Sequence, residues 1–151
     1  MAITFRVAAC VLFPFYFSTT LVARQQTVTA GTQTVVITAA AAGEKVRFSS
    51  PGATAQIRVQ ILSVNGDSLF DSSWKDGNVL DWPIDSLSQS LANGSYRCVV
   101  MVKDVEGNVT HKEAAIFAQG GRVSIEQRAD SDALTVLGTD ENGPKITLLA
   151  H

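Results

Sequence analysis

The sequence has few cysteines, and this limits how the fold can be stabilised. Cys10 lies in an N-terminal segment that we expect to be removed, which leaves Cys98 as the only cysteine in the remainder. A single cysteine excludes an intramolecular disulfide, so stability must come from packing. Cys98 shares a strand face with Tyr96, Val100 and Val102, and Arg97 and Lys103 mark the other face. We therefore predict that Cys98 is buried and unreactive within a strand.

Histidine and recognisable catalytic motifs are also scarce. The two histidines are His111, in a predicted strand, and the terminal His151. The sequence contains no nucleophile elbow, zinc-ligand spacing or phosphate-binding glycine loop. The acidic stretches at 104–108 and 140–143 do not have the ligand spacing of an EF-hand and are interpreted as turns. We therefore predict a protein that is not an enzyme, with no catalytic, metal-binding or cofactor-binding residues and no cofactor.

Clustered positive charge is absent from the sequence. The formal net charge is −2, and removal of the first 23 residues, which include only Arg6 as a charged residue, leaves 11 basic and 14 acidic residues. Nucleic-acid binding depends largely on neutralising phosphates with Lys and Arg. The charge distribution therefore predicts no nucleic-acid partner.

The only long apolar run lies at the N-terminus. Arg6 is followed by apolar residues from Val7 to about Tyr16 and then by a segment that ends in the small residue Ala23. This order is typical of a signal peptide, which we predict at residues 1–23. A membrane-spanning helix is the alternative, but Pro14 interrupts the apolar run that such a helix would need. We expect a secreted or cell-surface protein that contacts the membrane only transiently, through its signal peptide; the resemblance described below implies the bacterial envelope or the extracellular space.

Helical periodicity is missing from the rest of the chain, and strand patterns take its place. Apolar and polar residues alternate at 57–61. A strand is also predicted at 95–103, with a return strand at 109–117. Asn65-Gly66 and Asn93-Gly94 are typical of type I′ hairpin turns, and residues 106–108 form a third turn signal. The pattern predicts an all-β fold, an antiparallel Ig-like or fibronectin-like β-sandwich over residues 24–119.

A second region is predicted beyond Gly120-Gly121. Residues 120–151 contain short apolar runs separated by turn residues, and these runs have no obvious partner strands inside the chain. An unpaired strand edge is a template for pairing with another chain. We therefore expect a short β-rich tail with the potential for self-association.

Several motifs in the central region resemble a known family, the Ig-like domain of the flagellar hook-capping protein, copies of which occur in secreted bacterial proteins. The resemblance covers about 55 residues and implies a β-sandwich used as a spacer or assembly module. Trp82-Pro83-Ile84 departs from the Trp-Asp-Gly that is common in the family. The motifs are Ile57–Ile61, Asn65-Gly66, Leu69-Phe70, Gly77-Asn78, Asp81-Trp82, Leu91–Tyr96 and Val102–Val109.

The tail also resembles the start of the β-rich stalk in bacterial tail-fibre-like surface proteins, through residues 134–139 and 143–146. This resemblance implies the N-terminal part of a fibre that would trimerise through the tail. The first functional hypothesis is therefore a secreted, non-enzymatic structural or assembly module, with protein partners or with self-association through the C-terminal tail.

The alternative hypothesis is a carbohydrate-binding or surface-binding module of the adhesin type. Trp74 and Trp82 would form a sugar-stacking platform if both were exposed, although tryptophans in a small sandwich are more often buried. The polar groups between them, Lys75, Asp76 and Asn78, would contact the sugar hydroxyls.

Overall fold

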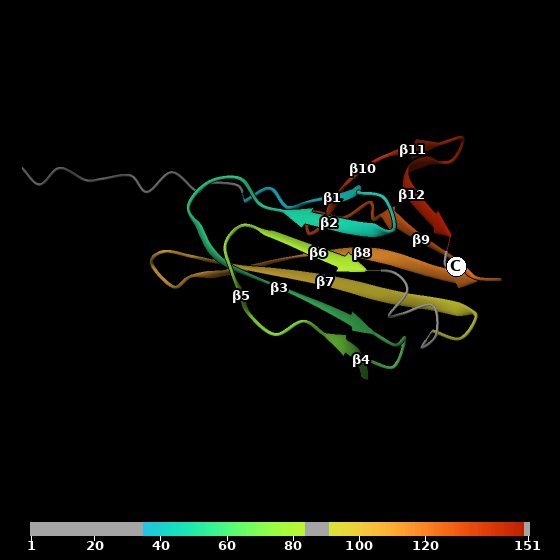
Figure 1. Cartoon of the computed structure of the whole chain (residues 1–151), viewed down its shortest axis with the longest axis horizontal. Helices are drawn as coiled ribbons and strands as arrows, with labels where there is room; N and C mark the ends of the chain where they lie inside the picture. The colour runs from blue at the N-terminus through green and yellow to red at the C-terminus, as the bar shows by residue number, and fades with distance from the viewer. Residues whose placement is uncertain (1–34, 84–90, 150–151) are drawn as a thin grey trace, which may run out of the picture. The chain divides into compact units, whose positions relative to one another are not determined.

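A computed structural model describes residues 35–83 and 91–149. These residues belong to one compact unit that spans Gln33–His151. All of the regular elements described in this unit are β-strands (Figure 1), and none of its segments is a helix of the length and apolarity needed to cross a membrane. The predicted signal peptide at 1–23 lies outside the described residues.

The strands form two sheets. The smaller sheet has the order β10-β1-β2-β6, and the larger has the order β11-β12-β9-β8-β7-β3-β4, with β5 also paired to β3. Every pairing is antiparallel except that of β1 with β10. The strands are β1 Thr38–Ala41, β2 Lys45–Ser49, β3 Thr54–Leu62, β4 Ser68–Asp71, β5 Lys75–Asp76, β6 Val79–Pro83, β7 Gly94–Asp104, β8 Val109–Gln119, β9 Arg122–Gln127, β10 Thr135–Leu137, β11 Thr139–Asp140 and β12 Gly143–Leu149.

One hydrophobic core holds the two sheets together. Successive side chains of a strand point to opposite faces, so alternate residues of each strand share the buried face. In β3 these are Ile57, Val59 and Ile61, and they join Val46 and Phe48 of β2 in the same buried cluster. The described residues are therefore an all-β arrangement of the sandwich kind, which confirms the coarse prediction of fold class.

The central strand β7 contributes the buried cysteine. Cys98 is 0% exposed and lies in the core cluster with Val100 and Val102. Burial raises the pKa of the Cys98 thiol far above its ordinary value, with a smaller contribution from Glu113. Because the thiolate is the reactive form, this environment makes Cys98 unreactive, and the prediction of a buried cysteine is confirmed.

The turns differ in type from those expected. Gly66 has a positive φ of 92°, but Asn65 does not share it, and the N–H of Gly66 donates to the carbonyl of Ser63 at 3.0 Å. A type I′ turn needs positive φ at both central residues, so the prediction of this turn type at Asn65-Gly66 is wrong. Asn93-Gly94 does not form a hairpin turn either; Gly94 begins β7, and Asn93 Oδ1 accepts from the N–H of Gly120 at 3.1 Å.

The turn between β7 and β8 is a hairpin, as predicted. Gly107 has a positive φ of 91°, and Asp104 Oδ1 accepts from the N–H groups of Glu106 and Asn108 at 2.9 and 2.8 Å. Hydrogen bonds, first from the Asn108 side chain and then from the backbone, lower the pKa of Asp104. The carboxylate oxygens of Asp104 therefore accept hydrogen bonds within the turn, in agreement with the prediction that residues 104–108 form a turn.

The chain changes sheets between β5 and β6. Lys75 and Asp76 pair with β3 in the larger sheet, whereas β6 pairs with β2 in the smaller one. Gly77, with a φ of 101°, donates its N–H to the carbonyl of Ala55, and the carbonyl of Asn78 accepts from the N–H of Ser50. The reversal expected at residues 75–78 is therefore a crossing between sheets and does not join two neighbouring strands of one sheet.

The region after Gly121 is part of the same sandwich, and the expectation that its strands lack partners inside the chain is corrected. Pairing continues across the predicted boundary, with β9 on β8, β12 on β9, and β10 parallel to β1 in the other sheet. Its apolar positions complete the common core because the alternating pattern directs them inward. They are Val123, Ile125, Leu134, Val136 and Ile146.

A close backbone approach holds β10 and β12 together. The N–H of Lys145 donates to the carbonyl of Gly138 at 2.9 Å. A Cβ atom at Gly138 would lie 2.6 Å from the carbonyl oxygen of Lys145, closer than real contacts allow. Glycine is therefore required at this point for steric reasons rather than for a special φ.

Candidate functional site

The predicted tryptophan platform is not present. Trp82 is 0% exposed, because its position in β6 faces the core, and its ring lies 6.3 Å from that of Phe48 and 5.9 Å from that of Phe70 between centroids. Trp74 is half-buried, and the ammonium of Lys103 lies 4.6 Å from its ring centroid. Since Trp82 has no exposed surface, the two rings do not form a joint sugar-stacking surface.

The polar residues predicted to accompany the tryptophans have structural roles. Lys75 and Asp76 are exposed and form the short strand β5. Asp76 Oδ1 accepts a hydrogen bond from Gln56 Nε2 at 2.9 Å. Asn78 helps to join the two sheets through its backbone carbonyl. The structure thus places Trp74, Lys75, Asp76 and Asn78 along the crossing between sheets.

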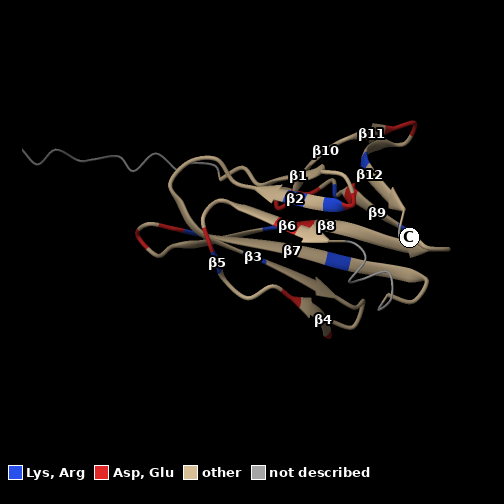
Figure 2. Ribbon diagram, viewed as in Figure 1, with Lys and Arg blue, Asp and Glu red and all other residues tan. Residues whose placement is uncertain are grey.

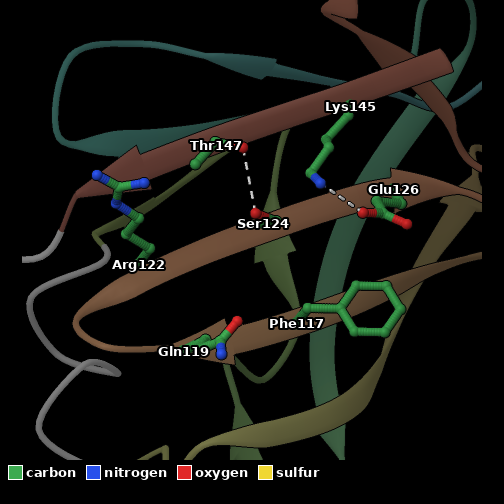
Figure 3. A pocket seen from close by; sticks show the side chains of 7 residues that line it. All are labelled: Phe117, Gln119, Arg122, Ser124, Glu126, Lys145 and Thr147. Atoms are coloured by element: carbon green, nitrogen blue, oxygen red, sulfur yellow. Dashed lines mark hydrogen bonds and ion pairs between the residues drawn. The ribbon is translucent and has the colours of Figure 1, made fainter. Parts of the chain in front are cut away.

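A different surface has the features of a binding site. A hollow of about 420 Å³ lies on the larger sheet, over β8, β9 and β12 (Figure 3). We call it the outer hollow. Its volume lies within the range of about 300–1,000 Å³ that is common for ligand sites, and its lining is one aromatic ring among polar side chains. Its lining residues are Phe117, Gln119, Arg122, Ser124, Glu126, Lys145 and Thr147.

Strand alternation explains why these residues meet. In β8 and β9 the residues facing the core include Ile116 and Ile125, so residues of the opposite parity face away from it. The register places Thr147 beside Ser124 and Ser124 beside Phe117. Short hydroxyl side chains in the middle of this row, with longer side chains around them, create the depression.

Polar groups are arranged along the outer hollow from one end to the other. Figure 3 shows Arg122 at one end, Ser124 and Thr147 in the middle, and Lys145 with Glu126 at the other. The hydroxyls of Ser124 and Thr147 lie 3.1 Å apart. Lys145 Nζ lies 2.8 Å from Glu126 Oε1. The lining therefore offers both hydrogen-bond donors and hydrogen-bond acceptors, together with one aromatic ring.

Acidic groups outnumber the single ammonium at the far end of the outer hollow. Besides Glu126, Lys145 Nζ lies 3.4 Å from Asp140 Oδ2. Hydrogen bonding to Glu126, with a further contribution from Asp140, raises the pKa of Lys145. Lys145 therefore remains charged at neutral pH, and the two carboxylates beside it exceed that charge by one.

Phe117 supplies the apolar part of the outer hollow. Its side chain is 40% exposed, although the neighbouring core positions of β8 are almost completely buried. The sequence did not predict Phe117 and the other lining residues as a site, because only the strand register brings them together. The available signal was the position of Phe117 in β8, out of step with Ile116 and Ala118, which predicts an outward-facing aromatic side chain.

The remaining charged residues are distributed over several strands (Figure 2). Arg47 pairs with Asp81 at 2.7 Å, and Arg58 donates to Asp71. Hydrogen bonding to Arg58 lowers the pKa of Asp71 well below its usual range. Throughout residues 35–83 and 91–149, no group of three or more His, Cys, Asp or Glu residues is placed to hold a metal ion.

Comparisons with known proteins give little further information. No family model matches the chain, and no curated protein matches it. The resemblance to the Ig-like domain of the hook-capping protein therefore stays a prediction. A crystal structure of CopC from Methylosinus trichosporium OB3b is similar to this chain with a TM-score of 0.34 and 20% identity, over 54% of this chain and 80% of that one. A similarity this low supports no inference about function.

Proposed function

We propose that this chain is a non-enzymatic β-sandwich module of an exported protein, and that it attaches that protein to a polysaccharide through the outer hollow. The observation that carries the proposal is the exposed ring of Phe117 on a polar sheet face. A sugar ring has an apolar C–H face and polar hydroxyl edges. An aromatic side chain surrounded by hydrogen-bonding groups complements both.

The arrangement of polar groups supports binding rather than catalysis. The carboxylate of Glu126, the acid that lines the outer hollow, is engaged with Lys145. Ser124 is hydrogen-bonded to Thr147 and has no adjacent histidine base in the lining. Activated nucleophiles need such a base or a lowered pKa. Hydroxyl, amide and carboxylate groups without an activating partner are suited to hydrogen-bonding a polyhydroxylated ligand.

The Ig-like type of the sandwich is part of this proposal. The hydroxyl of Tyr96, near the start of β7 and two residues before Cys98, donates to the carbonyl of Ala92 at 2.7 Å. Ig-like domains contain a tyrosine at a comparable place, bonded to backbone a few residues upstream. This contact and the signal-peptide pattern at 1–23 support an exported Ig-like module.

Substitution of Phe117 tests the proposed binding. Phe117→Ala removes the apolar face of the outer hollow, and we expect affinity for the bound polysaccharide to fall about tenfold, equivalent to about 1–2 kcal/mol of lost aromatic contact. Isothermal titration calorimetry would measure this with cellohexaose, maltohexaose and hexagalacturonate. Val109→Ala is the matched control, because Val109 is an exposed apolar residue, 53% exposed, on the same face of the same strand.

The two results that would contradict the proposal are distinct. Equal affinities of the Phe117→Ala variant and the wild type would exclude the outer hollow as the binding surface. Absence of binding to all three oligosaccharides by the wild type would count against polysaccharide attachment as such.

Self-association is the second candidate function, and the edge of β12 favours it. The N–H of Lys145 points away from β9, toward Gly138. Because direction alternates along a strand, the backbone groups of Thr147 and Leu149 point the same way. Within the described ranges, no strand pairs with that edge beyond residue 144. Leu149 is 54% exposed beside it, so the edge is a template for a second copy of the chain.

A proline on this edge tests self-association. We expect residues 24–151 to form an oligomer, the trimer implied by the fibre resemblance or a dimer, and Leu149→Pro to return it to a monomer because proline cannot donate to a ladder. Size exclusion with light scattering would measure the mass, with Leu149→Val as a control that keeps the N–H. A monomeric wild type at every concentration would exclude this function.

A further inference from the structure

Arg122 occupies a distinctive position in the outer hollow. It is the first residue of β9 and directly follows the turn at Gly120-Gly121. Its cross-strand neighbours are Gln119 on β8 and Leu149 on β12, neither of which is acidic. The side chain is exposed, and it forms one end of the lining.

The guanidinium of Arg122 is the one arginine side chain in the described part of the chain without an acidic partner. The others use their charge within the protein, where a planar guanidinium pairs well with a carboxylate. The paired arginines are Arg47 with Asp81, Arg58 with Asp71, Arg97 with Glu113, and Arg128 with Glu113 and Asp130. The charge of Arg122 is therefore available to a ligand.

The opposite end of the outer hollow disfavours an anion. There Glu126 and Asp140 lie within 2.8 and 3.4 Å of Lys145 Nζ. Two carboxylates against one ammonium leave that end neutral to negative, so a ligand carboxylate placed there would meet like charge. The asymmetry directs an acidic group toward Arg122 and neutral hydroxyls toward the other end.

From this asymmetry, we infer that the outer hollow selects an acidic polysaccharide, with a uronic-acid carboxylate paired to Arg122. Figure 3 shows Ser124 and Thr147 between the two ends and the ring of Phe117 on the side of Glu126. The uronic-acid unit at Arg122 therefore places hydroxyls near Ser124 and Thr147, and a neighbouring unit of the same polysaccharide places its C–H face on Phe117. This inference rests on the proposed polysaccharide binding and names the substrate class of the same site. A guanidinium can bind a carboxylate through two parallel hydrogen bonds, which gives geometric selectivity as well as attraction.

Removal of the guanidinium charge tests the inference. Calorimetric titrations would compare hexagalacturonate with cellohexaose, which has the same length and no charge. We expect the wild type to bind hexagalacturonate at least about tenfold more tightly, and Arg122→Gln to lose about that factor for hexagalacturonate only, since one charge-assisted pair is lost.

Lys75→Gln is the matched control. It removes the same unit of charge from exposed strand β5, which pairs with β3 and is separated from β9 by β7 and β8 in the strand order. We expect it to leave both affinities unchanged. An equal loss from Lys75→Gln and Arg122→Gln would mean a general electrostatic attraction and would overturn the inference.

The remaining outcomes separate the inference from the function on which it rests. If cellohexaose binds as tightly as hexagalacturonate and Arg122→Gln changes neither, while Phe117→Ala weakens both, polysaccharide binding stands and acidic selectivity is excluded. If the wild type binds maltohexaose but neither hexagalacturonate nor cellohexaose, acidic selectivity alone is excluded. If it binds none of the three, the proposed function is excluded as well.

Discussion

A chain ending at Gln119 is expected to unfold, although the sequence suggests a domain boundary there. The truncation removes β9, β10 and β12, and with them buried side chains at Val123, Ile125, Leu134, Val136 and Ile146. Each buried aliphatic residue contributes about 1.5–3 kcal/mol. Their combined loss is comparable with the whole stability of a typical domain, about 5–15 kcal/mol.

Circular dichroism and proton–nitrogen NMR spectra of the truncated chain would measure this effect. We expect loss of the β-sheet signal and collapse of amide chemical-shift dispersion, whereas a chain ending at Leu149, which keeps every described strand, retains both. A folded truncated protein with a cooperative thermal transition would show instead that the sandwich over 24–119 is independent of the region that follows it.

Trp82→Ala is expected to be the most destabilising of the tryptophan and aromatic substitutions, with a loss of about 3–5 kcal/mol in the free energy of unfolding. The indole is completely buried between the rings of Phe48 and Phe70. Removal leaves a large cavity that the two sheets cannot close without moving. Urea unfolding followed by circular dichroism, rather than by tryptophan fluorescence, would measure the change.

Two further variants make the test specific to burial. Trp82→Phe keeps an aromatic ring and removes an indole N–H that has no hydrogen-bond acceptor among the described residues, so we expect less than half of the loss caused by alanine. Trp74→Ala removes a half-buried ring and its contact with Lys103, with an expected cost of at most about 1 kcal/mol. A larger loss from Trp74→Ala than from Trp82→Ala would contradict the placement of Trp82 in the core.

The all-β class could be predicted from the sequence because strand alternation is a local signal. Ile57, Val59 and Ile61 repeat every second position, and the structure places them on one buried face. The buried Cys98 followed from the same reasoning. The turn type at Asn65-Gly66 could not be predicted, because this dipeptide is compatible with more than one backbone geometry. In the structure, only Gly66 of the two has a positive φ.

The partners of the last strands could not be predicted, because pairing depends on contacts between distant parts of the chain. Leu134 and Val136 lie in a short segment whose partner β1 is near the other end of the described chain. The candidate site was missed for the same reason. Phe117, Arg122 and Lys145 come from three strands, and only the register brings them to one surface.

The parallel pairing of β1 with β10 determines when the protein can finish folding. Thr38 meets Thr135, so the smaller sheet stays incomplete until almost the entire chain is available. Contacts between residues so far apart carry a high loop-closure cost and slow the folding of β-proteins. During synthesis, β1 therefore cannot pair with β10 until the C-terminal strands have been made. The native sandwich can therefore form only after residues 135–137 have been made.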